Sequence, residues 1–204
     1  MLCNLIILRD FQKKFNLMKK LILFVLLSFV MNYNLSYSQS DDSMESWNSY
    51  KTPGHVHEML AKATGNWNIT TKFWLTPGSD AFTSKGTSSA EMIMGGLFLK
   101  TSDKIEGMGN YRNGSAIIGY DNSAKVSQKI YIDDYGSGML YMTGTWDEAT
   151  KTVTYKGQMM DHDKDAYVDV SETMTFNGDT MILKAFRPDS KGNQFQYLEF
   201  VFTR

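Results

Sequence analysis

Apolar and polar residues alternate with a period of two along most of the chain beyond residue 65. The alternation is clearest over residues 66–75, 126–133, 168–176 and 196–204. A period of two predicts β-strands that each bury one face. Turn-forming pairs such as Pro77-Gly78, Asn113-Gly114 and Asn177-Gly178 separate the alternating runs. This spacing predicts about nine or ten short antiparallel strands.

A short segment ahead of the strands has a helical period instead. Thr52 is a suitable N-cap, Pro53 suits the first helical position, and Gly65 is expected to end the helix. The apolar residues are spaced i, i+3, i+4, i+7, as on one face of a helix: Val56, Met59, Leu60 and Ala63. We therefore expect one short helix before the first strand.

No further helix is visible in the pattern, so nothing would cover the two faces of a parallel sheet. One helix followed by an uninterrupted meander favours an antiparallel sheet closed into a barrel, because closure removes exposed strand edges. The alternative is an open two-sheet sandwich, since periodicity does not report closure. The prediction is an all-β chain with a single barrel domain over residues 52–204.

The start of the chain has the pattern of a secretory signal. Met18-Lys19-Lys20 is a short basic segment, residues 21–31 are apolar, and Ser36-Tyr37-Ser38 offers small residues for cleavage before Gln39. The apolar run is shorter than the roughly 20 residues of a membrane-spanning helix. We expect residues 1–38 to be a signal peptide with an upstream leader, translation starting at Met1 or Met18. Residues 39–51 should form a flexible lead, and the product should be periplasmic or secreted.

Charge and cysteine content exclude several kinds of partner. Residues 1–38 hold five basic residues and one acidic residue, whereas the remainder holds 16 basic and 21 acidic residues, a net charge of −5. An acidic body lacks the basic surface that binds a phosphate backbone, so nucleic acid is not expected as a partner. The single cysteine, Cys3, lies in the predicted export segment, so no disulfide partner exists.

Two features resemble lipocalins and other calycins. Gly65-Asn66-Trp67 follows the predicted helix and matches the Gly-x-Trp that opens the first strand of those barrels. The chain ends at Arg204, which the alternation places on the same face of its strand as Phe202. The resemblance implies that Trp67 closes one barrel end and that the Arg204 guanidinium packs across its indole ring, a cation–π pair.

A series of short motifs runs in order along the chain: Pro53-Gly54, Gly65-Asn66-Trp67, Met94–Leu99, Glu106–Gly109, Gly119–Asn122, Tyr131–Asp134, Gly136-Ser137-Gly138 and Glu199–Arg204. With these motifs the chain resembles, over about residues 44–204, the mostly bacterial, often exported group named domain of unknown function 1579. Tyr131 replaces an expected tryptophan and Ser137 an expected threonine. The resemblance implies a calycin-like β-barrel and no known reaction.

Several side chains are candidates to line a ligand site inside such a barrel. Glu172 lies on the apolar alternate of its strand, between Val170 and Met174, where a carboxylate could act as acid, base or ligand anchor. A rim position or a bulge that turns Glu172 outward is the alternative. Methionines are numerous and suit an adaptable apolar cavity, or simply a filled core. The predicted ligand-binding set is Trp67, Tyr120, Tyr131, Met142, Trp146, Glu172 and Met174.

The sequence gives little support for metal or cofactor chemistry. Asp161, His162 and Asp163 are the best metal-like cluster, but they lack the glycine and distal glutamate of a calcium loop and equally suit a solvated hairpin. Nucleophile-elbow, phosphate-loop and dinucleotide motifs are absent. Nitrobindin-like barrels use a late histidine for haem, and no histidine follows His162. We expect no cofactor.

Three functions remain open at this stage. The first is an exported barrel that holds a small apolar ligand in its lumen, oriented by polar groups. The second is an enzyme of unknown reaction that uses Glu172, which a second titratable group within hydrogen-bond reach would favour. The third is a ligand-free module that binds another protein through exposed aromatic residues, which a completely filled barrel would favour.

Overall fold

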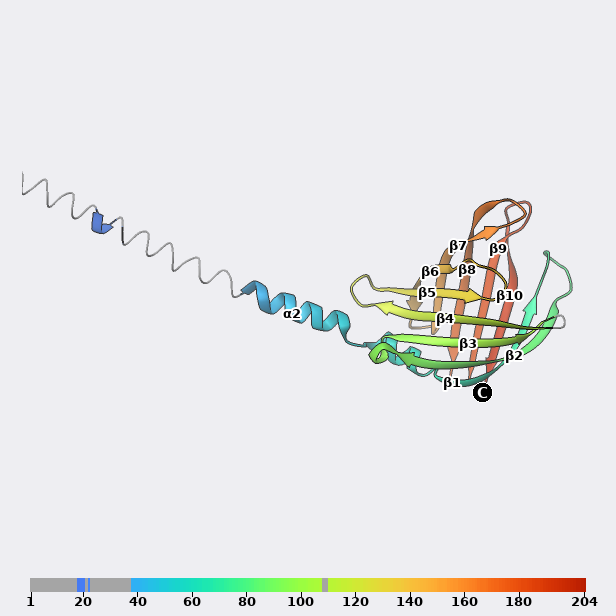
Figure 1. The fold of residues 1–204 in the computed structure, drawn as a ribbon, viewed down its shortest axis with the longest axis horizontal. Coiled ribbons are helices and arrows are strands. Elements are labelled where there is room, and N and C mark those ends of the chain that lie inside the picture. The colour runs from blue at the N-terminus through green and yellow to red at the C-terminus, as the bar shows by residue number, and fades with distance from the viewer. Residues whose placement is uncertain (1–17, 21, 23–37, 108–109) are drawn as a thin grey trace, which may run out of the picture. The chain divides into compact units, whose positions relative to one another are not determined.

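Ten antiparallel strands form a closed barrel in the computed structural model, which describes residues 18–20, 22, 38–107 and 110–204 (Figure 1). The chain divides into two compact units, residues 1–49 and 50–204, and the barrel lies in the second. The strands in order are β1 (Gly65–Phe73), β2 (Phe82–Ile93), β3 (Phe98–Glu106), β4 (Tyr111–Asp121), β5 (Val126–Asp133), β6 (Leu140–Asp147), β7 (Thr152–Asp161), β8 (Ala166–Asn177), β9 (Thr180–Pro188) and β10 (Gln194–Thr203).

Each strand pairs with the next along the chain, and β1 also pairs with β10. The closing ladder runs from Asn68 opposite Thr203 to Phe73 opposite Leu198. Closure leaves neither edge of the sheet unpaired, which removes the sites where exposed edges associate. The prediction of a single closed antiparallel barrel is thereby confirmed, and the open sandwich is excluded.

The helices differ in detail from the sequence expectation. Residues 39–51, expected to be a flexible lead, lie within helix α2 (Ser38–Lys51). Helix α3 (His55–Ala61) begins two residues later than predicted, with Gly54 rather than Thr52 as its N-cap. The Gly54 N–H donates to Nδ1 of His57 at 3.0 Å, which satisfies the N-terminal backbone as a capping side chain does.

The predicted export segment lies outside the described residues except for residues 18–20, 22 and 38. Within the described part of the chain, no helix combines the length and the hydropathy of a membrane span. A short 3₁₀ helix, η1 (Met94–Gly96), connects β2 to β3. The C-terminal end of α3 leads through Lys62 into β1, so Gly65 begins the first strand instead of ending the helix.

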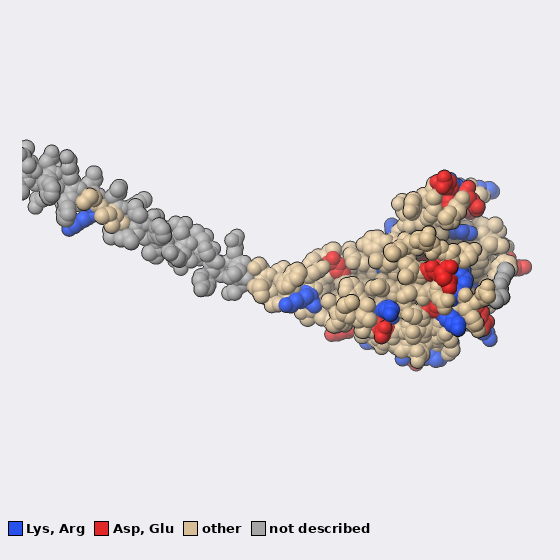
Figure 2. All heavy atoms as spheres, viewed as in Figure 1, with Lys and Arg blue, Asp and Glu red and all other residues tan. Residues whose placement is uncertain are grey.

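The core fills the barrel and the space beneath α3. Val56, Met59 and Leu60 of α3 are buried against strands, and the inward alternates of the strands continue the same cluster. We call the end covered by α3 the helix end, and the end with the 74–81, 134–139 and 189–193 loops the far end. On the visible face, acidic and basic side chains are interspersed and much of the surface carries neither (Figure 2).

Strand β5 places its apolar residues outside. Ile130 and Ile132 are 41% and 44% exposed, whereas Ser127 and Lys129 are buried and Tyr131 is partly buried. A strand whose polar alternates face inward puts hydrogen-bonding and charged groups into the lumen. This inversion supplies one side of the candidate site.

Candidate functional site

A small cavity of about 40 Å³ lies in the lumen. A single water needs roughly 10–15 Å³, so the cavity is large enough for a few waters. Its apolar walls include Leu99, Ile118, Met174, Leu183, Phe200 and Phe202. Its polar walls are Ser88, Thr101, Asp103, Lys129 and Tyr131.

A buried ion pair joins β5 to β8 across the lumen. Nζ of Lys129 donates to Oε2 of Glu172, and their side chains are only 5% and 8% exposed. Charges taken out of water are stable only when they are paired, because their desolvation is expensive. The ammonium also lies 5.7 Å from the ring centroid of Tyr131 and 5.9 Å from that of Tyr155. Two aromatic faces therefore add to the stabilisation of the Lys129 charge.

A second carboxylate faces the same cavity from β3. Oδ1 of Asp103 accepts a hydrogen bond from Oγ of Ser88 at 2.5 Å, and both residues are buried. Burial raises the pKa of Asp103 above its ordinary value, while the Ser88 hydrogen bond and the nearby Lys129 charge oppose the rise. Asp103 therefore binds a proton more readily than an exposed aspartate does.

Three tyrosines surround these charges. Burial raises the pKa of Tyr131 and of Tyr155, and raises that of Tyr197 to about 12. The Glu172 charge raises all three further, so the hydroxyls stay protonated at neutral pH. The Tyr155 hydroxyl is buried without an aligned hydrogen-bond partner among the described residues. Of the three tyrosines, Tyr131 lines the cavity, so the site offers a neutral hydroxyl donor beside Lys129 and Asp103.

Of the predicted ligand-binding residues, the structure brings Tyr131 and Met174 to the cavity wall, and Glu172 pairs with Lys129 on that wall. Met142 is fully buried in the core. Tyr120 packs edge-on against His57, with ring centroids 6.1 Å apart, below α3. Burial lowers the pKa of His57, which favours its neutral ring. Trp67, Tyr120, Met142 and Trp146 are not among the residues that line the cavity.

Trp67 and Arg204 lie together at the helix end. The Arg204 guanidinium carbon is 4.4 Å from the centroid of the Trp67 ring, and Trp67 is 2% exposed. Nη2 of Arg204 also donates to the carbonyls of Lys62 at 2.8 Å and Thr64 at 3.0 Å. Arg204 therefore holds the end of α3 and the start of β1 to the last strand.

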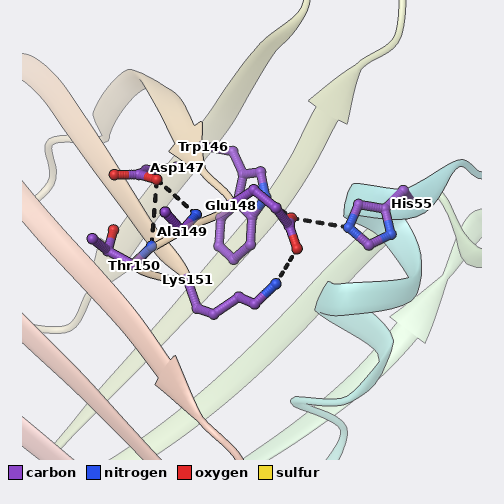
Figure 3. A network of polar contacts seen from close by, with 7 residues as sticks. All are labelled: His55, Trp146, Asp147, Glu148, Ala149, Thr150 and Lys151. Atoms are coloured by element: carbon purple, nitrogen blue, oxygen red, sulfur yellow. Dashed lines mark hydrogen bonds and ion pairs between the residues drawn. The ribbon is translucent and has the colours of Figure 1, made fainter.

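Trp146 belongs to a polar network at the helix end, outside the cavity (Figure 3). Its Nε1 donates to Oε2 of Glu148 at 2.8 Å, and Nε2 of His55 lies 2.9 Å from the same oxygen. Nζ of Lys151 donates to Oε1. The hydrogen bonds from Lys151, Trp146 and His55 lower the pKa of Glu148 to about 2. The network ties the start of α3 to the loop between β6 and β7.

The structure does not assemble the metal-like cluster. Asp161 accepts the backbone N–H of Asp163 at 3.1 Å and forms an ion pair with Lys164 at 3.2 Å, so its carboxylate organises its own loop. Among the residues that the structure describes, no three His, Cys, Asp or Glu side chains are grouped to hold a metal ion.

Sequence reasoning missed Lys129 and Asp103. Asp103 lies on the inward alternate of its strand with Leu99 and Ile105, the same signal that identified Glu172. Lys129 gave no comparable signal, because its neighbours on the same face are Ser127 and Tyr131 while the isoleucines face outward.

Comparison with known proteins supports the fold and names a family. None of the curated proteins matches the chain. The chain is similar to Rv2717c from M. tuberculosis, known from a crystal structure, with a TM-score of 0.56 and 10% sequence identity. That similarity covers 75% of this chain and 99% of the other, and at such identity it concerns the fold alone. The family model "Protein of unknown function (DUF1579)" matches residues 52–204. The chain therefore belongs to this family.

Proposed function

We propose that this protein is exported and binds a small ligand in the barrel lumen, with the ligand's apolar part against the β9 and β10 walls and its polar part at the charged cluster. The observation that carries the proposal is the cavity itself. Its lining is mostly apolar, and Asp103, Lys129 and Tyr131 are among its few polar residues. Ligand sites combine a mostly apolar lining with a few converging polar groups in this way.

The present volume of the cavity favours a small ligand or an adjustable wall. About 40 Å³ is far below the several hundred Å³ of sites for drug-sized molecules. Met174 and Met181 line the cavity, and methionine side chains change conformation at low energetic cost. Binding of a molecule with more than a few heavy atoms is expected to move these two side chains.

Filling the cavity tests the proposal. Ala90 lines it from β2, and Ser89, the preceding residue, faces outward and is exposed. Ala90→Leu should weaken the binding of a probe such as octanol, measured by calorimetry, at least about tenfold, which corresponds to about 1.4 kcal/mol. Ser89→Leu is the matched control and should bind as the wild type does. Equal binding by both variants, or no binding of any probe by the wild type, would refute lumen binding.

A second function, acid–base catalysis, is favoured by one observation. Asp103 faces the cavity with a raised pKa, so its carboxyl group takes up a proton more readily than an ordinary aspartate and can pass that proton to a bound molecule. Glu172, the residue that the sequence suggested for this role, is instead engaged with Lys129.

Intact-mass measurement of the exported protein tests the export half of the proposal, because a mature form that retains Lys19 would contradict cleavage before Gln39.

A further inference from the structure

We infer that the ligand of the lumen is an amphipathic primary amine, whose ammonium group pairs with Asp103 while its apolar part lies along the β9 and β10 walls. This inference rests on the proposed function and adds the chemical class of the ligand. Asp103 lines the cavity, and so do Leu183 of β9 and Phe200 of β10. Both ends of the molecule therefore belong to one cavity.

Asp103 is a buried carboxyl group with one unpartnered oxygen. The residue is 8% exposed, and its Oδ1 accepts the hydrogen bond from Ser88. Within the described ranges, neither a hydrogen bond nor an ion pair reaches its Oδ2. Lys129 acts on the pKa of Asp103 through space, but the Lys129 ammonium is paired with Glu172. A buried acceptor without a donor is costly, so this oxygen favours a ligand that brings one.

The lumen holds more acidic than basic groups. Among the buried residues that the structure describes, Lys129 is the one lysine or arginine, beside the two carboxyl groups of Asp103 and Glu172. Burial raises the pKa of Asp103, as expected where its negative charge is not fully compensated. A cationic ligand balances the Asp103 charge, whereas an anionic one would add to two carboxylates and compete for Lys129.

Small neighbours leave room for an ammonium group beside Asp103. In the sheet register, Asp103 lies between Ser88 of β2 and Gly114 of β4. A Cβ atom at Gly114 would collide with the hydroxyl of Tyr131, so that hydroxyl lies beside the position opposite Asp103. The hydroxyl oxygens of Ser88 and Tyr131 can both accept hydrogen bonds. A primary ammonium has three N–H donors, which suit the free Asp103 oxygen and these two hydroxyls.

Small residues also line the way from Asp103 to the apolar walls. Ala90 and Ala116 are the next inward residues of β2 and β4 beyond Ser88 and Gly114, and both line the cavity. Leu99 also lines it, four residues from Asp103 on β3, which is about 13 Å along an extended strand. That length suits a short or medium alkyl chain on the ammonium group.

Calorimetric titration with octylammonium, octanol and octanoate, each as monomers at pH 7, tests this inference. The wild type should bind octylammonium at least about tenfold more tightly than octanol, because a charge-assisted hydrogen bond replaces a neutral one. It should bind octanoate more weakly than octanol. Asp103→Asn should lose the preference for octylammonium while its affinity for octanol stays within about threefold of wild type. Asp169→Asn, the same substitution at an exposed position of β8, is the matched control and should keep the preference.

The outcomes separate the two proposals. If the wild type binds octylammonium no more tightly than octanol, or binds octanoate most tightly, the inference fails while lumen binding stands. A preference that survives in Asp103→Asn would also overturn it, because the cation would then bind elsewhere. If none of the three molecules binds, lumen binding itself fails. The ranking of the three molecules by the wild type tests the charge preference even if the Asn variant does not fold. Circular dichroism of each variant establishes that it is folded.

Discussion

The ion pair between Lys129 and Glu172 gives the most informative stability prediction. Lys129→Met leaves Glu172 and Asp103 in the lumen without the cation, and all three side chains are buried. Removing one partner of a buried pair costs about 3–5 kcal/mol, because the remaining charge is desolvated and uncompensated. For a domain of this size, 1 kcal/mol lowers Tm by about 2–4 °C, so the variant should melt roughly 10 °C below the wild type.

The reverse deletion should cost less. Glu172→Gln leaves Lys129 within the field of Asp103, whose pKa already responds to the Lys129 charge. The double variant Lys129→Met/Glu172→Leu removes both charges and keeps apolar bulk, which is often near neutral for a buried pair. It should therefore recover at least half of the loss seen in Lys129→Met. The coupling energy between the two sites should exceed about 2 kcal/mol.

Urea denaturation of the wild type, both single variants and the double variant at pH 7 measures these differences. The m-values should agree, so that midpoint shifts report stability alone. Single variants within about 1 kcal/mol of wild type, or single effects that simply add in the double variant, would refute the buried pair as described.

Three further changes test other parts of the structure. Asp103→Asn should flatten the pH dependence of stability. Because the pKa of Asp103 is raised in the folded state, the native protein binds a proton that the unfolded chain releases. The stability of the wild type therefore falls as pH rises from the ordinary aspartate pKa through the raised one. Tm measured across that range should converge for the two proteins at low pH and favour the variant at neutral pH. Arg204→Ala should cost about 2 kcal/mol in urea denaturation, because it removes the Trp67 stacking and two hydrogen bonds to backbone carbonyls, and Arg204→Lys should recover part of it. The lowered pKa of Glu148 stabilises the wild type above the ordinary glutamate pKa, and this stabilisation is lost as pH falls toward about 2. Glu148→Gln should lack it, so the variant should have the lower Tm at neutral pH and the two Tm curves should meet near pH 2.

The strands were largely predictable because alternation of apolar and polar residues is regular along the sequence, whereas closure of the barrel is not reported by that alternation. The inward face of β1, with Trp67, Ile69 and Thr71, reads directly from the period of two. Helix α2 was not predicted, since its residues are polar and give no apolar stripe. The start of α3 was missed because the cap is made by the side chain of His57 on the Gly54 backbone, a contact with no common sequence signature.

The candidate site was predictable only in part. Glu172 and Met174 follow from the apolar alternation of β8, and Asp103 could have been found by the same reasoning. Lys129 could not, because its importance depends on which face of β5 turns inward and on which carboxylate lies across the lumen. Such pairings join strands that are distant in sequence, and hydropathy carries no information about them.

Methyl NMR of protein labelled at its methionine methyl groups tests lumen binding most directly. Met174 and Met181 line the cavity, whereas Met94 and Met139 are 72% and 76% exposed. On titration with octanol, the two cavity methyl signals should shift and saturate together while the two exposed ones stay in place. Shifts confined to the exposed methionines, or no shift at any methionine, would contradict the claim that the lumen is a binding site.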